Sequence, residues 1–124
     1  MISMYPRTLT PAQGTFFLFG PRAIGKSTWI AERFPGAVVY DLLVTSEHLR
    51  LSRDPSLFGR ECEALPDESW VVIDEVQRVP LLLDEVQRLM TRKRHRFVLS
   101  GSSARKLRRG GANLLAGRAE IRRL

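Results

Sequence analysis

A short segment rich in small residues carries the residue types that can bind phosphate. Residues 20–27, Gly-Pro-Arg-Ala-Ile-Gly-Lys-Ser, match the phosphate-loop pattern G-x-x-x-x-G-K-[ST] at every defined position. Its glycines let the backbone approach an anion closely, and successive backbone N–H groups can then surround phosphate oxygens. Lys26 would reach the β- and γ-phosphates, and the Ser27 hydroxyl would ligate Mg²⁺. The segment predicts a site for a nucleoside triphosphate.

The residues on either side of this segment favour a true phosphate loop over a glycine-rich turn before an ordinary helix. Thr15–Phe19 is apolar and predicts a buried strand, whereas Ser27–Phe34 predicts a helix that Pro35 and Gly36 end. The N-terminus of that helix adds unpaired N–H groups and a positive dipole end. The residues expected to bind the nucleotide are Gly20, Pro21, Arg22, Ala23, Ile24, Gly25, Lys26, Ser27 and Thr28.

Two acids follow another apolar strand, Trp70–Asp74, with Glu75 directly after it. Ligands of open α/β sheets lie beyond the carboxyl ends of the strands, so Asp74 and Glu75 are expected near the phosphates. Asp74 would hold the Mg²⁺ ion through its hydration shell, and Glu75 would polarise a water for attack on the γ-phosphate. Taken alone, the pair could also be exposed acids that begin a turn.

A polar tip also follows the apolar run Arg96–Ser100, whose last residue begins the sequence Ser-Gly-Ser-Ser. A hydroxyl there could sense the γ-phosphate or hold the attacking water, with Ser100 as first choice and Ser102 as second. The alternative is a serine and glycine turn that caps the next helix. Asp41 likewise ends an apolar run, so every polar candidate falls at the carboxyl end of an expected strand.

Short apolar runs alternate with helical segments along the chain. The expected strands are Thr15–Phe19, Ala37–Asp41, Trp70–Asp74 and Arg96–Ser100, with Arg118–Leu124 as a candidate fifth. The expected helices are Ser27–Phe34, Thr45–Arg53, Pro55–Leu65, Pro80–Thr91 and Ala104–Arg109. The first four strands lack clean alternation, so we expect both faces of each to be buried. The pattern predicts an α/β fold with three layers and a mostly parallel sheet.

Bulk composition limits the remaining classes of protein. The 124 residues suit one domain, expected to span 1–124. Cys62 is the only cysteine, which excludes a disulfide framework and makes a reducing cytoplasm the expected location. No run approaches the roughly 20 apolar residues that span a bilayer, so no membrane partner is expected. The net charge of +7 gathers in clusters at 92–96, 105–109 and 122–123. Nucleic acid is a less favoured partner of these clusters than water or an acidic protein segment.

Several of these pieces stand in the order of one family. They are residues 20–27, Tyr-Asp-Leu at 40–42, Ile-Asp-Glu-Val-Gln-Arg-Val-Pro at 73–80, Ser-Gly-Ser-Ser at 100–103 and Leu-Ala-Gly-Arg at 115–118. The chain resembles the N-terminal ATPase domain of AAA-like prokaryotic ATPases of the AAA_14 type, which usually carry a DUF4143 domain at the C-terminus. The resemblance covers nearly the whole chain.

The resemblance implies a P-loop NTPase fold of the additional-strand class, an α/β/α sandwich on a five-stranded sheet in the order 5-1-4-3-2. It implies that Lys26 and Ser27 bind phosphate and Mg²⁺, that Asp74 coordinates Mg²⁺, that Glu75 is the catalytic acid and that Ser100 occupies the sensor position. Family members continue past residue 124, so the domain is expected to be incomplete at its C-terminus and to lack the DUF4143 domain. A homo-oligomer or a C-terminal partner domain is therefore an expected partner.

The expected function is Mg²⁺-dependent binding and hydrolysis of ATP that drives a switch in a partner domain or subunit. Arg22, Arg105 and Arg118 are candidates for stabilising transition-state charge, although surface salt bridges are the ordinary role of arginine. Two other functions stay open: a nucleotide- or nucleic-acid-binding module without turnover, and a small P-loop kinase. A GTPase is disfavoured because no [NT]-K-x-D segment is present.

Overall fold

A single parallel sheet organises the chain. The computed structural model describes residues 14–20, 26–92, 94–102 and 120–123. Its strands are β1 (Phe16–Phe19), β2 (Val38–Asp41), β3 (Trp70–Asp74), β4 (Arg96–Gly101) and β5 (Glu120–Arg123). They lie in the order β2-β3-β4-β1-β5, and every neighbouring pair is parallel. This confirms the expected five-stranded sheet of order 5-1-4-3-2, with β4 between β1 and β3.

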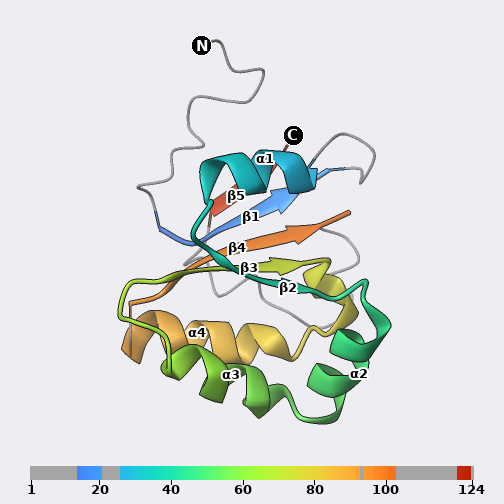
Figure 1. The fold of residues 1–124 in the computed structure, drawn as a ribbon, viewed down its shortest axis with the longest axis vertical. Helices are drawn as coiled ribbons and strands as arrows, with labels where there is room; N and C mark the ends of the chain where they lie inside the picture. The colour runs from blue at the N-terminus through green and yellow to red at the C-terminus, as the bar shows by residue number, and fades with distance from the viewer. Residues whose placement is uncertain (1–13, 21–25, 93, 103–119, 124) are drawn as a thin grey trace.

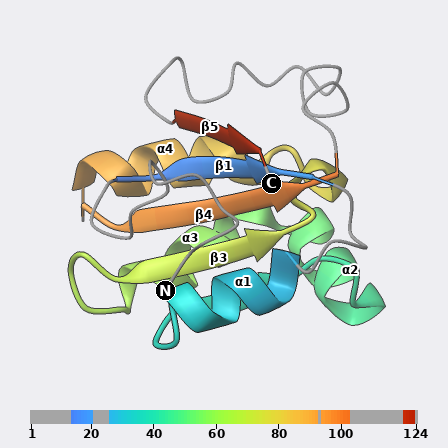
Figure 2. The same cartoon turned by 90° about the horizontal axis from the view of Figure 1, so that it is seen from above.

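Helices cover both faces of the sheet. They are α1 (Lys26–Arg33), α2 (Thr45–Arg53), α3 (Pro55–Glu63), the 3-10 helix η2 (Val76–Arg78) and α4 (Leu82–Arg92). Helix α1 lies on one face, and α3 and α4 lie on the opposite face, which gives the expected three layers (Figures 1 and 2). Helix α2 has the expected bounds, and the bounds of α1, α3 and α4 differ from the expected ones by at most two residues. Helix α4, for example, begins at Leu82 because Pro80 and Leu81 form a preceding turn that accepts from Leu83 N and Asp84 N. The expected helix at 104–109 lies outside the described residues.

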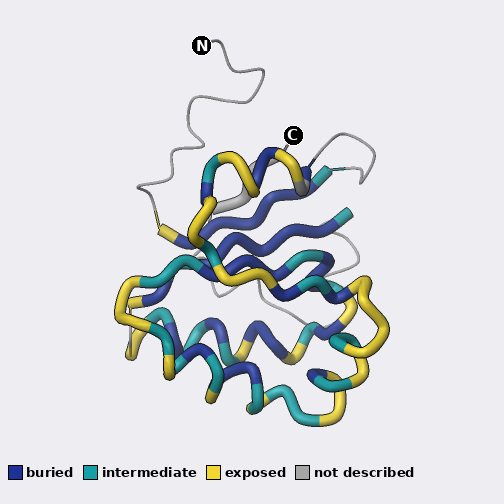
Figure 3. The backbone as a smooth tube through the Cα atoms, viewed as in Figure 1, coloured by how far each residue is buried: buried dark blue, intermediate teal, exposed yellow. Residues whose placement is uncertain are grey.

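Alternate residues of each central strand enter two different apolar clusters. On the α1 side the cluster contains Phe16, Leu18, Trp29, Ile30, Phe34, Val72 and Val98. On the other side, Phe17 and Phe19 of β1 join a larger cluster beneath α3 and α4. In Figure 3 the inner strands are largely dark blue, and the helices show dark blue patches between exposed and intermediate ones. All four residues of β1 are buried, which explains why this strand shows no alternation in sequence.

Strand β2 departs from the expectation that both faces of every strand are buried. Val39 remains 59% exposed and Val38 36% exposed. Strand β2 is an edge strand, paired only with β3 in the described sheet. Helix α1 packs on Phe16, Val72 and Val98 of the three inner strands. The expectation was wrong for β2 because apolar composition cannot tell an edge strand from a central one.

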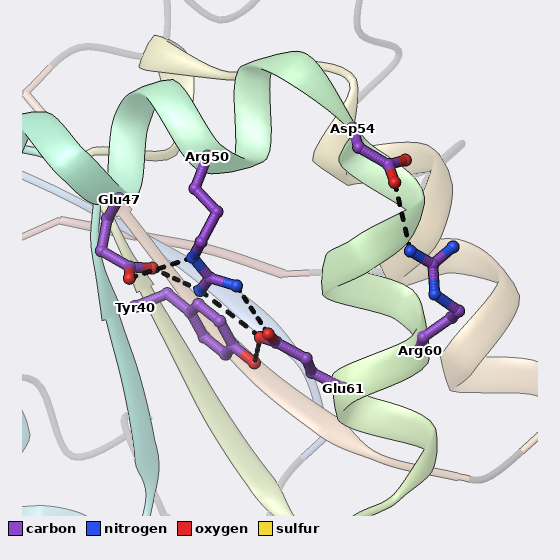
Figure 4. A network of polar contacts seen from close by, with 6 residues as sticks. All are labelled: Tyr40, Glu47, Arg50, Asp54, Arg60 and Glu61. Carbon is purple, nitrogen blue, oxygen red and sulfur yellow. Dashed lines mark hydrogen bonds and ion pairs between the residues drawn. The ribbon is translucent and has the colours of Figure 1, made fainter.

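A polar network fastens α2 and α3 to this edge strand (Figure 4). The Tyr40 hydroxyl donates to Glu61 Oε1 at 2.8 Å, and the Tyr40 ring meets Phe58 edge-on at 4.8 Å between centroids. The Arg50 guanidinium donates to Glu61 Oε2 at 2.6 Å and to Glu47 Oε1 at 2.7 Å. These contacts join three elements around the end of β2, and they hold in place the strand that carries Asp41.

Candidate functional site

The carboxyl ends of the strands bring the expected polar residues to one edge of the sheet. In the strand register Asp41 lies beside Asp74, and Asp74 lies beside Ser100. Gly20 follows the end of β1, and its N–H donates to Gly101 O at the end of β4 at 3.2 Å. The parallel sheet thus gathers at a single edge residues that are up to about eighty positions apart in the chain.

Lys26, the first residue of α1, is the cation of this edge. Its side chain is buried, with the residue 2% exposed. Its Nζ donates to Gly20 O at 3.0 Å and to Gly101 O at 2.9 Å, and it lies 3.7 Å from Glu75 Oε2. A buried ammonium must find acceptors and a counter-charge, and these three groups supply them. Lys26 therefore joins β1, β4 and the residue after β3 through one charged group.

Glu75 is the most constrained acid of the site. The residue is 2% exposed and has a left-handed backbone, with φ of 61° and ψ of 51°. Its Oε1 accepts from Gln77 Nε2 and from Ser102 Oγ, the latter at 3.2 Å. Its Oε2 faces Lys26 and accepts from Ser102 Oγ at 3.4 Å. A left-handed non-glycine residue costs about 1–2 kcal/mol, so these contacts hold a backbone that the residue would not adopt alone.

Asp74 occupies the last position of β3, with Asp41 as its partner in the strand register and Glu75 as the next residue. Burial raises the pKa of its carboxyl above the ordinary value. The hydrogen bond from Ser100 to Asp74 Oδ1 opposes the rise, whereas the neighbouring charges of Asp41 and Glu75 reinforce it. A cation at this edge would relieve the repulsion and favour the ionised carboxyl.

The donors present fit Mg²⁺, which prefers hard oxygen ligands. Among the described residues no group of three or more metal-binding side chains gathers anywhere. Magnesium rarely needs such a group, because it usually keeps several waters and takes one or two carboxylates plus substrate phosphates. Asp74, a half-buried carboxylate at the carboxyl end of β3, matches that pattern of ligation.

The two serine candidates contact different acids. Ser100, the first choice, donates to Asp74, which is its partner in the strand register. Ser102, the second choice, donates to both oxygens of Glu75. Asp41 uses its Oδ1 to accept from Leu43 N at 3.0 Å in the turn that follows β2. All of these residues therefore lie at the edge where they were expected, each with a distinct neighbour.

Several expected residues lie outside what the structure describes. They are Pro21, Arg22, Ala23, Ile24 and Gly25 of the loop, together with Arg105 and Arg118, and the Ser27 side chain is not described either. Thr28 lies in α1 and is exposed.

Two residues of the site were not found by sequence reasoning. Gln77 reaches back from η2 to Glu75, and Gly101 passes between Gln77 and Lys26. A Cβ on Gly101 would stand 2.6 Å from Gln77 Oε1, so only glycine fits there without movement. The available signals were the glycine in Ser-Gly-Ser-Ser and the glutamine two positions after Glu75. Neither residue type indicates a contact without the turn that brings the two together.

The described arginines of the cluster at 92–96 have partners within the chain. Arg92 pairs with Glu63 at 3.4 Å, and Arg94 pairs with Glu68 at 3.4 Å. Arg96 donates to Glu68 O at 2.8 Å. The ion pairs of Arg92 and Arg94 are solvent-exposed surface pairs, which contribute little to stability.

Comparison with known proteins agrees with the fold just described. A family model described as an AAA domain, AAA_14, matches residues 12–124. No curated protein matches the chain significantly. Within the described part of the chain, no helix has the length and apolar character needed to cross a membrane. Because the family model covers nearly all of the sequence, the chain belongs to the AAA_14 family, whose AAA domain is a nucleotide-binding ATPase domain.

Proposed function

We propose that this domain binds ATP with Mg²⁺ at the carboxyl edge of its sheet and hydrolyses the bond to the γ-phosphate. The observation that carries the proposal is the buried Lys26 ammonium, held between two backbone carbonyls and the Glu75 carboxylate at the start of α1. A buried cation beside a helix N-terminus and a phosphate-loop sequence suits a polyphosphate ligand.

Each residue of the edge takes one role in this proposal. Lys26 exchanges its present acceptors for oxygens of the β- and γ-phosphates. Asp74 and the Ser27 hydroxyl would hold Mg²⁺, and Ser100 orients the Asp74 carboxylate by the hydrogen bond it already makes. When bound, the Mg²⁺ ion neutralises developing negative charge on the phosphates.

Glu75 acts on the attacking water. The water oxygen forms a bond to the γ-phosphorus, and the bond from that phosphorus to the bridging oxygen breaks, with its electron pair leaving on ADP. Glu75 accepts the proton that the water loses, and the products are ADP and inorganic phosphate. Ser102, which contacts both Glu75 oxygens, keeps the carboxylate directed toward this water.

The same contacts suggest how the nucleotide state reaches a partner domain or subunit. Lys26 links Gly20 to Gly101, so its move to phosphate alters the ends of β1 and β4 together. A partner that packs on either strand end would respond to ATP binding and hydrolysis.

Hydrolysis by matched glutamate variants tests the proposal. The sequence Asp-Glu-Val-Gln-Arg occurs at 74–78 and again at 84–88, so Glu75→Gln and Glu85→Gln make the same change in the same local sequence. We expect Glu75→Gln to bind Mg-ATP but to release phosphate about 100-fold or more slowly, and Glu85→Gln to match wild type. Equal turnover in both variants would overturn the role of Glu75.

The same assay separates the alternatives. Binding of Mg-ATP without phosphate release by wild type would indicate a binding module, and transfer of phosphate to a small acceptor without free phosphate would indicate a kinase.

A further inference from the structure

The turn after β3 brings Gln77 back onto Glu75. Glu75 adopts the left-handed conformation, η2 begins at the next residue, and Arg78 N donates to Glu75 O at 3.0 Å. This tight reversal places the Gln77 amide beside the Glu75 carboxylate, where Nε2 donates to Oε1. The contact lies within one short turn, independent of the phosphate loop.

We propose that Gln77 is the positioning residue of Glu75. Gln77 keeps its hydrogen bond to Glu75 Oε1 when nucleotide binds, so that Glu75 Oε2 is the oxygen that accepts the proton from water. The proposal rests on the hydrolysis proposed above. Among the described residues, Gln77 and Ser102 donate to Glu75 and Lys26 forms an ion pair with it. Lys26, which faces Oε2, is the one expected to leave for phosphate. Ser102 contacts both oxygens and selects neither. Gln77 therefore decides which oxygen becomes free.

The amide oxygen of Gln77 also supports a positioning role. Its Oε1 is buried and accepts no hydrogen bond from the described residues. Exchanging the amide oxygen and nitrogen would set two oxygens against each other at Glu75, so the bond to Glu75 fixes the orientation. A buried carbonyl left without a donor is destabilising. Among the described residues, the bond to Glu75 is thus the hydrogen bond that directs the Gln77 amide.

The repeated pentapeptide provides an internal comparison. Gln87 stands two residues after Glu85, as Gln77 stands after Glu75. Both Gln87 and Glu85 belong to α4, where side chains at i and i+2 do not face each other. Glu85 instead contacts Arg88, at 2.8 Å from Arg88 Nη2 to its Oε1. The contact of Gln77 with Glu75 therefore comes from the turn and not from the local sequence.

Steady-state kinetics with binding measurements test the role. Gln77→Met removes the amide but keeps the length of the side chain, and Gln87→Met is its matched control. We expect Gln77→Met to lower kcat about 10- to 100-fold, with the Kd for a non-hydrolysable Mg-ATP analogue unchanged within about twofold. Gln87→Met should leave both unchanged. Wild-type kcat in Gln77→Met would overturn the proposal, whereas no turnover by wild type would overturn the proposed hydrolysis as well.

A second measurement uses the wild-type chain and needs no activity. Gln13, Gln77 and Gln87 are the glutamines of this chain, and triple-resonance assignment of the wild-type chain identifies the side-chain amide signal of Gln77 in a ¹⁵N–¹H spectrum. We expect this signal at a hydrogen-bonded position, unmoved by the Mg-ATP analogue, and shifted to a free-amide position in Glu75→Ala. A free-amide position in wild type, or one reached when the analogue binds, would overturn the proposal even if Gln77→Met failed to fold.

Discussion

Replacing Gly101 by alanine should push Gln77 away from Glu75. The added Cβ would stand 2.6 Å from Gln77 Oε1 and 3.4 Å from Phe19 Cε1. Ordinary contact begins at 3.4 Å, so the Gln77 oxygen must retreat by about 0.8 Å while the Phe19 ring can stay in place. Gly101 is the last residue of β4 in register with Phe19, and its backbone lies outside the left-handed region, so alanine adds no backbone strain.

Two opposing terms set the expected loss of stability. A hydrogen bond to a charged group contributes about 1.5–3 kcal/mol, which is lost if the Gln77 amide leaves Glu75. Alanine in place of a strand glycine raises the free energy of unfolding by about 0.5–1 kcal/mol, because the unfolded chain has less conformational entropy to lose. The free energy of unfolding should therefore fall by about 1–2 kcal/mol. Misplacement of a catalytic geometry by about 1 Å can slow turnover about 100-fold, so kcat should fall as well.

Urea unfolding followed by tryptophan fluorescence measures the first effect. Trp29 belongs to the apolar cluster under α1, and Trp70 packs against it. Gly36→Ala is the matched control, because among the described residues no atom beyond the chain neighbours of Gly36 lies within 4 Å of its added Cβ. By the same entropy term, its stability should equal that of wild type or exceed it by up to about 1 kcal/mol. If Gly101→Ala is as stable and as active as Gly36→Ala, Gln77 does not lie against Gly101 and the reasoning fails.

Three further predictions concern the network at the edge strand and the buried thiol. Tyr40→Phe keeps the ring but loses the hydrogen bond to Glu61, which is partly exposed. The free energy of unfolding measured in urea should therefore fall by about 1 kcal/mol. No fall would mean that the hydrogen bond is absent in solution. Burial alone would raise the pKa of Glu61, but the bonds from Arg50 and Tyr40 lower it below the ordinary 4.5. The stabilisation from Glu61 is therefore present above pH 4.5 and is lost as pH falls through the pKa of the folded state. The difference in unfolding free energy between wild type and Glu61→Gln should shrink below pH 4.5. A difference that stays constant with pH would contradict this assignment. Burial raises the pKa of the Cys62 thiol to about 12. Iodoacetamide at pH 8 should therefore label Cys62 only after denaturation, as measured by mass spectrometry. Rapid labelling of the native chain would show that the thiol is accessible.

The polar edge could be expected from the residues themselves because its signals are local or general, whereas the strand order was expected only from the family resemblance. The phosphate-loop pattern fixes a strand before it and a helix after it, and parallel strands must align their carboxyl ends. Asp74, Ser100 and Lys26 therefore lie at one edge, as their positions after or before apolar runs predicted. The exposure of Val39 could not be expected in the same way, because it depends on which strands α1 covers.

The environment of Glu75 was beyond sequence reasoning for a specific reason. Residues 74–78 and 84–88 have the same five-residue sequence, yet one forms a strand end with η2 and the other forms part of α4. The valine of each copy, Val76 or Val86, is buried in the same apolar cluster. Neither the pentapeptide nor the burial of its valine therefore determines the left-handed backbone of Glu75 or the reach of Gln77, which belong to the turn that follows β3.

The most direct test of a phosphate site at the start of α1 is the melting temperature with and without a non-hydrolysable Mg-ATP analogue. Lys26→Gln removes the buried charge but keeps hydrogen-bond donors, and Arg92→Met removes an exposed positive charge as its control. At 100 times its Kd the analogue should stabilise wild type and Arg92→Met by about 2.7 kcal/mol, and Lys26→Gln far less. An equal rise in Lys26→Gln, or no rise in a wild type that melts cooperatively, would contradict a nucleotide site built on Lys26.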